Sequence, residues 1–260
     1  MREKLSAISI RSGLGTSFVG QRIIHYPKLS STMAVAREEA LAGAVEGTVV
    51  IAEEQTAGKG RLERTWVSPQ GSIALSVILY PEPSNMLSLI MVASLAVVKA
   101  IESVTGLKPQ IKWPNDVLIK GKKVCGILVE SGISGGDKTY VVIGIGINAN
   151  IKTESMGEVI MPATSLTYEL GREVSRLELV KRLLVEMERL YLLAQGSGVV
   201  YQEWRDSLVT LGKSVQASSG DTVYEGIAES VDEDGRLLIR CRDGSLKQFT
   251  AGNVTLQKET

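Results

Sequence analysis

Two short stretches of the sequence combine basic, amide and carboxylate side chains at spacings that suit chemistry on a phosphate ester. The first, residues 58–66, reads GKGRLERTW. Its glycines let backbone N–H groups approach an anionic ligand closely, and Arg61 and Arg64 supply positive charge. On spacing alone, two arginines in a polar loop could equally be solvated surface residues. The stretch is therefore a candidate anion-binding loop.

The second stretch, residues 112–130, contains KWPND followed by KVCGILVE. Asn115 and Asp116 offer hard oxygen donors for a nucleotide–metal complex, although an Asn-Asp pair after proline could also be a plain turn. Gly126 lies in an apolar run, where a ligand could press on the backbone. The stretch also has three lysines near a hairpin turn, among which spacing alone does not choose: Lys120, Lys122 and Lys123.

Two other nucleotide-binding motifs fit the sequence poorly. Residues 58–60 lack the earlier glycine and the following serine or threonine of a Walker loop. Residues 144–146 lack the third glycine of a dinucleotide fingerprint. Neither a kinase-type P-loop nor a Rossmann site is supported.

The composition is that of a globular protein, with 44% hydrophobic and 22% charged residues, and 29 basic residues balance 29 acidic ones. This balance argues against a general nucleic-acid binder, which normally shows a basic surplus. Cys125 and Cys241 lie far apart and His25 is the single histidine, so neither a disulfide framework nor a structural zinc site is expected. Cys125 lies in an apolar run and is interpreted as a small buried hydrophobe rather than a nucleophile.

No targeting or membrane segment is predicted. Residues 1–10 have mixed charge and no apolar core, unlike a signal peptide. The most apolar run, residues 86–98, is shorter than the ~20 residues that a membrane span needs. We therefore expect a cytoplasmic protein.

Hydrophobic periodicity and turn residues predict an α+β fold, in which helices pack on one face of a mixed sheet. The predicted helices cover residues 31–42, 85–104, much of 164–190, and 200–208. The predicted strands cover residues 48–52, 72–80, 110–113, 117–120, 124–130 and 140–147.

The pattern changes near residues 211–212. Beyond this point, turn residues at 219–221, 234–235 and 243–244 separate short apolar runs. Asp-Gly pairs between alternating apolar residues are strong hairpin signals. The C-terminal part is therefore predicted to be a small β-barrel.

The two motifs resemble those of the biotin–protein ligases. That family has GRGRxxRxW where this chain has GKGRLERTW, and KWPND followed by K(V/I/L)xGIL(V)E where this chain has residues 112–130. Weaker similarities follow the family's order at Ser31-Thr32, at GIGIN in residues 144–148 and at ATSL in residues 163–166. The resemblance spans residues 22–260, and two long motifs in the same order argue against chance similarity.

The resemblance implies a fold and a division of the chain. The expected catalytic domain is like that of the class II aminoacyl-tRNA synthetases, with a mixed sheet, and the C-terminal barrel is of the Src-homology type. The implied domains are a short N-terminal connector at residues 1–21, a catalytic domain that binds biotin and ATP at 22–211, and the small barrel at 212–260.

The resemblance also implies an activity. The protein would activate biotin with ATP to biotinyl-5'-AMP and transfer biotin to a specific lysine of the biotin carboxyl carrier domain of a biotin-dependent carboxylase. ATP and Mg²⁺ are the implied cofactors, and biotin is the substrate. The implied partners are the carrier protein and a second copy of the chain in a homodimer, with no nucleic acid and no membrane.

The family's site residues carry over to matching positions. Lys123 matches the active-site lysine that directly precedes Val-x-Gly, and Arg61 matches the arginine that orders the loop over the ligand, so both are predicted to be catalytic. The residues predicted to bind biotin are Ser31, Thr32, Gln55, Gly58, Lys59, Gly60, Arg61, Lys123, Gly126, Leu128 and Gly144. The residues predicted to bind ATP are Arg61, Arg64, Trp66, Asn115, Asp116, Lys123 and Asn148, with Asp116 as the predicted magnesium ligand.

Two positions depart from the family pattern. Lys59 stands where the family usually has arginine, which removes a planar bidentate donor. Met33 follows Ser-Thr where the family often has asparagine, which removes one polar contact. Their effects are not predicted by the resemblance.

Three alternative functions compete with this interpretation. A biotin-responsive transcriptional repressor would carry an N-terminal helix-turn-helix, for which the residues before the ligase core are too few. A lipoate–protein ligase would share the fold, although KWPND favours biotin. A protein that holds biotinyl-AMP without transferring it has no distinguishing sequence feature, so that alternative stays open.

Overall fold

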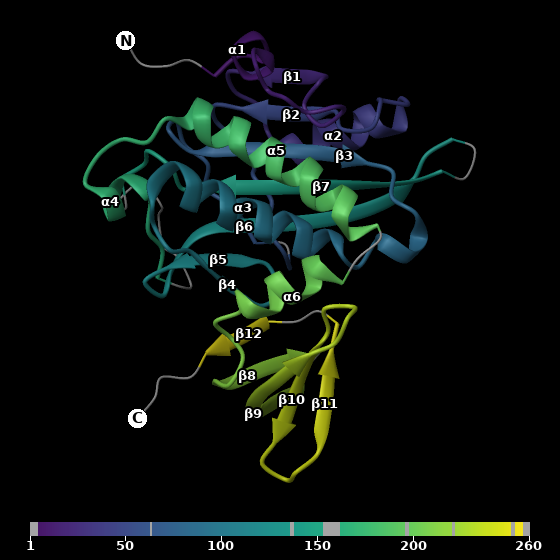
Figure 1. The fold of residues 1–260 in the computed structure, drawn as a ribbon, viewed down its shortest axis with the longest axis vertical. Coiled ribbons are helices and arrows are strands. Elements are labelled where there is room, and N and C mark those ends of the chain that lie inside the picture. The colour runs from purple at the N-terminus through teal and green to yellow at the C-terminus, as the bar shows by residue number, and fades with distance from the viewer. Residues whose placement is uncertain are drawn as a thin grey trace.

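The computed structural model describes residues 5–62, 64–135, 138–152, 162–195, 198–219, 222–250 and 253–256. They form a seven-stranded mixed sheet with helices and, at one end of the molecule, a five-stranded antiparallel sheet (Figure 1). The strand order in the larger sheet is β1-β2-β3-β7-β6-β5-β4. Its strands are β1 (Ile23–Tyr26), β2 (Val49–Ala52), β3 (Ile73–Leu79), β4 (Gln110–Lys112), β5 (Asp116–Ile119), β6 (Lys122–Ile133) and β7 (Thr139–Ile147). The predicted α+β class is confirmed.

Helices cover both faces of the larger sheet. On one face lie α1 (Ala7–Arg11), α3 (Leu89–Thr105), α5 (Arg176–Ala194) and α6 (Val199–Asp206). The helix α2 (Thr32–Leu41) instead crosses between the parallel strands β1 and β2 and packs on the opposite face. The predicted single helical face therefore holds for α3, α5 and α6 but not for α2. Because α2 is rich in alanine, its sequence does not indicate which face of the sheet the helix covers.

The two faces of the sheet carry side chains of different size. Successive residues of a strand point to opposite faces, and the register pairs Ala74 with Gly146, Ser76 with Gly144, and Gly126 with Gly146. At the centre of the sheet, the face toward α2 therefore carries only small side chains or none, and we call it the bare face. The opposite face presents large core residues to α3 and α5, namely Leu75, Val77, Ile143, Ile145 and Ile147. This alternation leaves room for a ligand on the α2 face alone.

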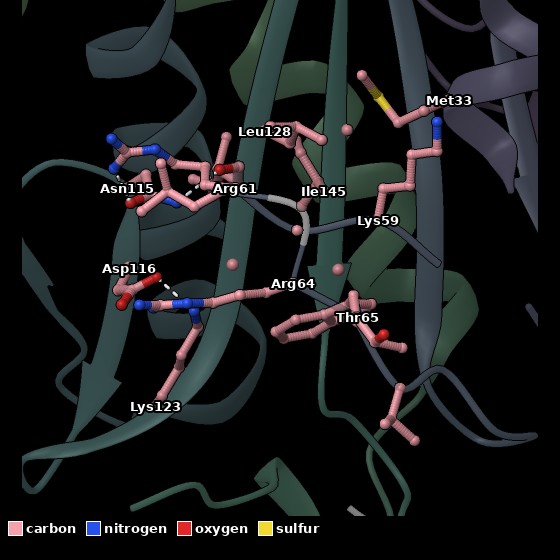
Figure 2. A pocket seen from close by; sticks show the side chains of 18 of the residues that line it. Met33, Lys59, Arg61, Arg64, Thr65, Asn115, Asp116, Lys123, Leu128 and Ile145 are labelled. Atoms are coloured by element: carbon pink, nitrogen blue, oxygen red, sulfur yellow. Dashed lines mark hydrogen bonds and ion pairs between the residues drawn. The ribbon is translucent and has the colours of Figure 1, made fainter. Parts of the chain in front are cut away.

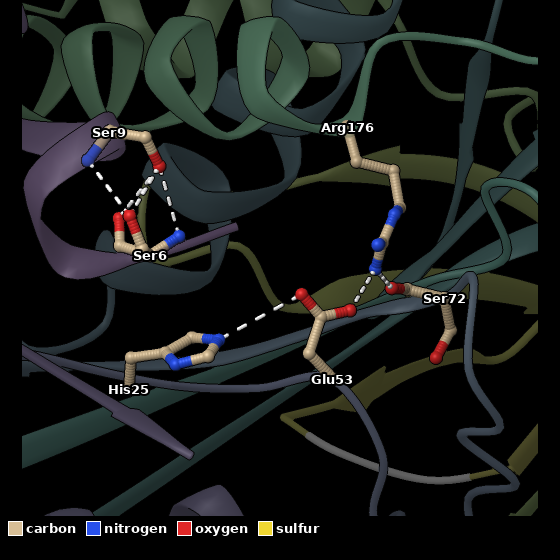
Figure 3. A network of polar contacts seen from close by, with 6 residues as sticks. All are labelled: Ser6, Ser9, His25, Glu53, Ser72 and Arg176. Atoms are coloured by element: carbon tan, nitrogen blue, oxygen red, sulfur yellow. Dashed lines mark hydrogen bonds and ion pairs between the residues drawn. The ribbon is translucent and has the colours of Figure 1, made fainter. Parts of the chain in front are cut away.

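The described residues before β1 pack against the helical layer. Leu5 and Ile10 are buried against the helical layer, and a capping box between Ser6 and Ser9 begins α1 (Figure 3). The Glu188 carboxylate of α5 accepts hydrogen bonds from the backbone N–H groups of residues 17, 18 and 19 at 2.6, 2.8 and 2.9 Å. Such a buried carboxylate is stabilised by several donors at once. The role of residues 1–21 as a connector stays a prediction.

One ion-pair network ties α5 to the strands that flank the candidate loop. Arg176 Nη1 donates to Glu53 Oε2 at 2.7 Å and to the Ser72 carbonyl at 3.1 Å (Figure 3). His25 Nε2 lies 3.8 Å from Glu53 Oε1. Glu53 follows β2 and Ser72 precedes β3, so this network fixes both ends of the connection that contains residues 54–69.

The helical region predicted from residue 164 is divided in two. The short helix α4 (Leu166–Leu170) ends at Gly171, which has a φ of 69° and caps it in the left-handed conformation. Ser175 then caps α5 by accepting a hydrogen bond from the Glu178 N–H at 3.1 Å. A 3-10 turn, η1 (Pro83–Asn85), precedes α3. No helix in the described part of the chain is long and apolar enough to cross a membrane.

The C-terminal part is an antiparallel sheet, as the hairpin signals predict. Its order is β11-β10-β9-β8-β12, with β8 (Ser214–Ser219), β9 (Thr222–Val231), β10 (Leu237–Cys241), β11 (Leu246–Phe249) and β12 (Asn253–Leu256). Gly235 and Gly244 have φ values of 78° and 82° in the two predicted Asp-Gly turns. The predicted turn at 219–221 lies partly outside the described residues.

A hairpin turn of the small sheet packs against α3, α6 and the residue that follows β4. The buried Trp113 Nε1 donates to the Gly235 carbonyl at 2.8 Å, and a Cβ at Gly235 would lie 2.8 Å from the Met91 Cε atom and 3.6 Å from the Trp204 ring. The C-terminal sheet therefore shares a packed boundary with the larger part of the molecule. The domain limit at residues 211–212 stays a prediction, and contacts cross it.

Replacing Trp113 with phenylalanine should lower the free energy of unfolding by about 1–3 kcal/mol, because the buried Gly235 carbonyl loses its donor. Trp204→Phe is the matched control, since Trp204 is also fully buried but its Nε1 has no hydrogen-bond partner among the described residues. Urea unfolding followed by tryptophan fluorescence measures both. Equal losses in the two variants would show that the Trp113 hydrogen bond contributes nothing.

Candidate active site

A cavity of about 450 Å³ opens on the bare face of the larger sheet. Figure 2 shows Met33 and Lys59 on one side of it and Asn115, Asp116 and Lys123 on the other. The other predicted residues that line it are Ser31, Thr32, Gln55, Gly60, Arg61, Arg64, Trp66, Gly126, Leu128, Gly144 and Asn148. Residues from both sequence motifs and from α2 therefore meet at a single cavity.

Gly58 is the predicted site residue that does not line the cavity. It is buried, and a Cβ there would collide with the Trp66 carbonyl and lie 2.9 Å from Gln55 Nε2. Trp66 N donates to the Gly58 carbonyl at 2.9 Å, and Gly60 N donates to the Arg64 carbonyl at 2.7 Å. The loop is thus a small hairpin, and Gly58 allows its two arms to approach closely.

A polar group of side chains lies at the α2 end of the cavity. Gln55 Oε1 accepts from the Thr32 backbone N–H at 2.8 Å and from Thr32 Oγ1 at 3.1 Å. Ser76 Oγ donates to Thr32 Oγ1 at 2.9 Å. Ser31 is the N-cap residue of α2, yet its hydroxyl makes no cap hydrogen bond and is buried without a partner among the described residues. An unpartnered buried hydroxyl beside a cavity is suited to a polar ligand group.

Cationic side chains gather at the opposite end. Lys123 Nζ lies 2.5 Å from Asp116 Oδ1, and Arg61 Nη1 donates to Asn115 Oδ1 at 2.8 Å. The second contact joins the hairpin loop directly to the KWPND motif. Burial lowers the pKa of Arg61, and the nearby Asp116 opposes this shift.

The backbone around Lys123 is held by a segment that follows β7. Lys123 N donates to the Pro162 carbonyl at 2.8 Å, and Thr164 N donates to the Lys123 carbonyl at 2.9 Å. Asn148 Nδ2 donates to the Thr164 carbonyl at 3.0 Å. The segments with the sequences ATSL and GIGIN therefore lie beside Lys123, and their hydrogen bonds hold its backbone in position.

The three candidate lysines of the hairpin have different surroundings. Lys120 Nζ pairs with Glu169 Oε2 at 2.9 Å and has a 72% exposed side chain. Lys122 Nζ lies 5.4 Å from the centre of the Tyr168 ring. Lys123 alone of the three lines the cavity, and its role as the active-site lysine stays a prediction.

The indole of Trp66 lies against two glycines of the larger sheet, Gly126 of β6 and Gly146 of β7. A Cβ at Gly126 would lie 3.0 Å from its ring, and a Cβ at Gly146 would collide with its Nε1 edge. Lys123 Nζ lies 5.5 Å from the ring centre, within the range of a cation–π contact. The flat ring is therefore held between the sheet and the cationic cluster.

Lys112 is a cavity residue that the sequence reasoning did not assign to the site. Its side chain is almost completely buried, with 8% of the residue exposed. Burial lowers its pKa, Asp116 opposes this shift, and Lys123 and Arg64 reinforce it. Lys112 is the first residue of the KWPND motif, so the motif could have indicated it. A lone lysine in a short strand is, however, ordinarily solvated.

Comparison with known proteins identifies the family. A model described as the Biotin/lipoate A/B protein ligase family matches residues 26–148, and one described as the Biotin protein ligase C terminal domain matches residues 210–256. The biotin--[acetyl-CoA-carboxylase] ligase of Mycobacterium tuberculosis is 33% identical over 270 residues, covering 98% of this chain and 96% of the relative. The chain belongs to the biotin protein ligase family.

Other members of the biotin protein ligase family agree with this assignment. The bifunctional ligase/repressor BirA of Bacillus subtilis is 36% identical over 254 residues, covering 95% of this chain and 78% of the relative. The biotin protein ligase of Aquifex aeolicus, solved in complex with biotin and ATP, has a TM-score of 0.77 at 28% identity and covers 92% of this chain and 100% of that structure. The expected fold of a biotin protein ligase, including the C-terminal β domain, is confirmed.

The site residues of the biotin protein ligase family remain predictions in their individual roles. Cys125 is fully buried on the far side of the sheet, and burial raises the pKa of its thiol, so it is a core residue as expected. Among the described residues, no group of three or more His, Cys, Asp or Glu side chains could hold a metal ion.

Proposed function

We propose that the protein activates biotin with ATP and transfers the biotinyl group to a lysine of a biotin carboxyl carrier domain. The observation that carries this proposal is the division of one cavity into an end with the hydroxyl and amide groups of Ser31, Thr32 and Gln55 and an end with the cations Arg61 and Lys123. The ureido group of biotin suits Ser31, Thr32 and Gln55, which offer hydroxyl and amide groups. The carboxylate of biotin and the phosphates of ATP suit the cationic end.

In the first step, a biotin carboxylate oxygen attacks the α-phosphorus of ATP. The bond from this phosphorus to the bridging oxygen breaks, and pyrophosphate leaves with the electron pair. Negative charge builds on the α-phosphate as the bond forms. Lys123 and Arg61 line the cavity as preorganised cations, so they stabilise that charge without a reorganisation cost.

In the second step, the neutral amine of the acceptor lysine attacks the carbonyl carbon of the mixed anhydride. AMP leaves with the electrons of the broken carbon–oxygen bond, the amine nitrogen gives up a proton, and an amide forms. Water would destroy the anhydride in the meantime. The hairpin loop, tied to Asn115 through Arg61, is placed to exclude water.

Magnesium fits the site as an ion that arrives with ATP. Mg²⁺ in nucleotide sites is usually bound by one or two carboxylates together with substrate phosphates. Asp116 supplies one carboxylate at the cavity wall, beside the amide oxygen of Asn115. When bound, the ion would offset charge on the phosphates.

We also expect a homodimer that extends the large sheet. The outer side of β4 is occupied, because Ile111 N donates to the Ser207 carbonyl and Val209 N donates to the Ile111 carbonyl, both at 2.9 Å. At the other edge, no strand in the described part of the chain pairs with the outer side of β1. An open edge strand can pair with a second copy. Sedimentation analysis should find dimers, and a monomer at every concentration would contradict this.

Mass spectrometry of an acceptor tests the proposed transfer. A biotin carboxyl carrier domain incubated with the protein, biotin and MgATP should gain one biotinyl group at its acceptor lysine. The same domain incubated with lipoate should remain unmodified. Formation of biotinyl-AMP without transfer would favour a binding protein, and lipoylation would favour a lipoate ligase. A cytoplasmic location and the absence of nucleic-acid partners stay predictions.

A further inference from the structure

The contact between Met33 and Gly144 shapes the polar end of the cavity. Met33 is the second residue of α2, is 4% exposed and lines the cavity. A Cβ at Gly144 would lie 2.6 Å from Met33 Sδ and 3.0 Å from its Cγ. With a larger residue at position 144 the Met33 side chain would have to shift, because its thioether occupies the space that the new side chain needs.

The neighbours of this contact are the groups proposed to hold the ring system of biotin. Thr32 and Gln55 line the same cavity, and Leu128 pairs with Gly144 across β6 and β7. Met33 thus adds an apolar surface next to the hydroxyl and amide groups. The methionine side chain lacks the amide group with which an asparagine could hydrogen-bond the ureido group. Met33 therefore affects ligand binding through the space that it fills.

Met33 belongs to the buried cluster between α2 and the sheet. The other buried residues of this cluster are Ala36, Ala40, Val50, Ile78, Tyr140 and Val142. The backbone of Gly144 is fixed between β3 and β6. The width of the cavity at this point is therefore set by two residues, one long and flexible and the other without a side chain.

Resting on the proposed function, we infer that Met33, seated on Gly144, is a specificity-determining residue that limits the size of the ring system the site accepts. The pair admits the unsubstituted bicyclic ring of biotin and rejects a ring enlarged by one methyl group. Hydrophobic pockets discriminate a single methylene by about 10- to 200-fold. Because the contact lies away from the reacting carboxylate, it should change KM rather than kcat.

A double-mutant cycle on the full chain tests this inference. Gly144→Ala should raise the KM for biotin by at least about tenfold, because the new Cβ collides with the thioether. In a Met33→Ala background, the same Gly144→Ala change should cost about threefold or less, because the space is then free. Met33→Leu conserves volume and should stay within about threefold of the parent. Thermal melting confirms that each variant is folded.

Selectivity supplies the second readout. The parent should use 1'-N-methylbiotin far less well than biotin in ATP–pyrophosphate exchange, and Met33→Ala should reduce that discrimination by about tenfold. Additive effects of the two substitutions, or an unchanged discrimination, would overturn the inference. A folded parent that shows no biotin-dependent exchange would instead refute the proposed function, so the two failures are distinguishable.

Discussion

Replacing Lys123 with alanine is expected to slow the formation of biotinyl-AMP by about 100- to 1,000-fold, the typical loss when one preorganised charge-stabilising donor is removed. Lys123 Nζ is the cation held against Asp116 at the cavity wall. Its backbone hydrogen bonds to Pro162 and Thr164 do not depend on the side chain. The fold should therefore survive, and pyrophosphate exchange with a melting curve measures both properties.

Lys120→Ala is the matched control for Lys123→Ala. Lys120 belongs to the same hairpin, but its amine pairs with Glu169 outside the cavity. Its loss should leave adenylation within about threefold of the parent, because the Lys120 side chain is 72% exposed and the buried Glu169 carboxylate keeps its hydrogen bond from Thr164 Oγ1. If Lys120→Ala is the damaging substitution and Lys123→Ala is nearly neutral, the assignment of the active-site lysine is wrong.

Replacing Arg61 with alanine should free the intermediate. The Arg61 guanidinium joins the hairpin loop to Asn115 at 2.8 Å, so its removal unties the loop from the KWPND motif. Biotinyl-AMP should then escape and acylate lysines on bystander proteins, while modification of the carrier falls by at least about tenfold. Proteomic mapping of biotinylated lysines in a mixture of the carrier and an unrelated protein measures the ratio.

Arg22→Ala provides the comparison for Arg61→Ala, because Arg22 pairs with Glu39 at 2.7 Å away from the cavity. It should leave biotin confined to the carrier lysine. An Arg61→Ala protein that modifies only the carrier, at the rate of the parent, would show that the loop does not retain the intermediate.

Local signals in the sequence predicted most of the elements. Runs of β-branched residues and periodic apolar positions predicted β2, β3, α3 and β7 close to their limits, since these elements are largely buried. The strand β6 extends beyond the predicted residues 124–130 at both ends, where its residues are only partly buried or exposed. The local signals did not reveal that residues 7–11 form a helix or that residues 23–26 form an edge strand. Both are short, and their burial depends on α5 and β2, which are distant in sequence.

The candidate site was less accessible to sequence reasoning. The motifs named the loop and the lysine, because the chemistry of phosphate binding restricts residue types. They did not show that α2 covers the bare face, that Lys112 is buried beside Asp116, or that Val254 and Thr255 of β12 also line the cavity. Each of these depends on contacts between segments that are far apart in the chain.

The most direct test of the proposed function is biotin-dependent exchange of labelled pyrophosphate into ATP, with lipoate in a parallel reaction. This exchange reports the reversible first step alone, before any carrier is needed. We expect exchange that requires biotin and Mg²⁺, is absent with lipoate, and falls by about 100- to 1,000-fold in Lys123→Ala. Exchange supported by lipoate instead of biotin, or no exchange by the folded protein with either acid, would contradict the account.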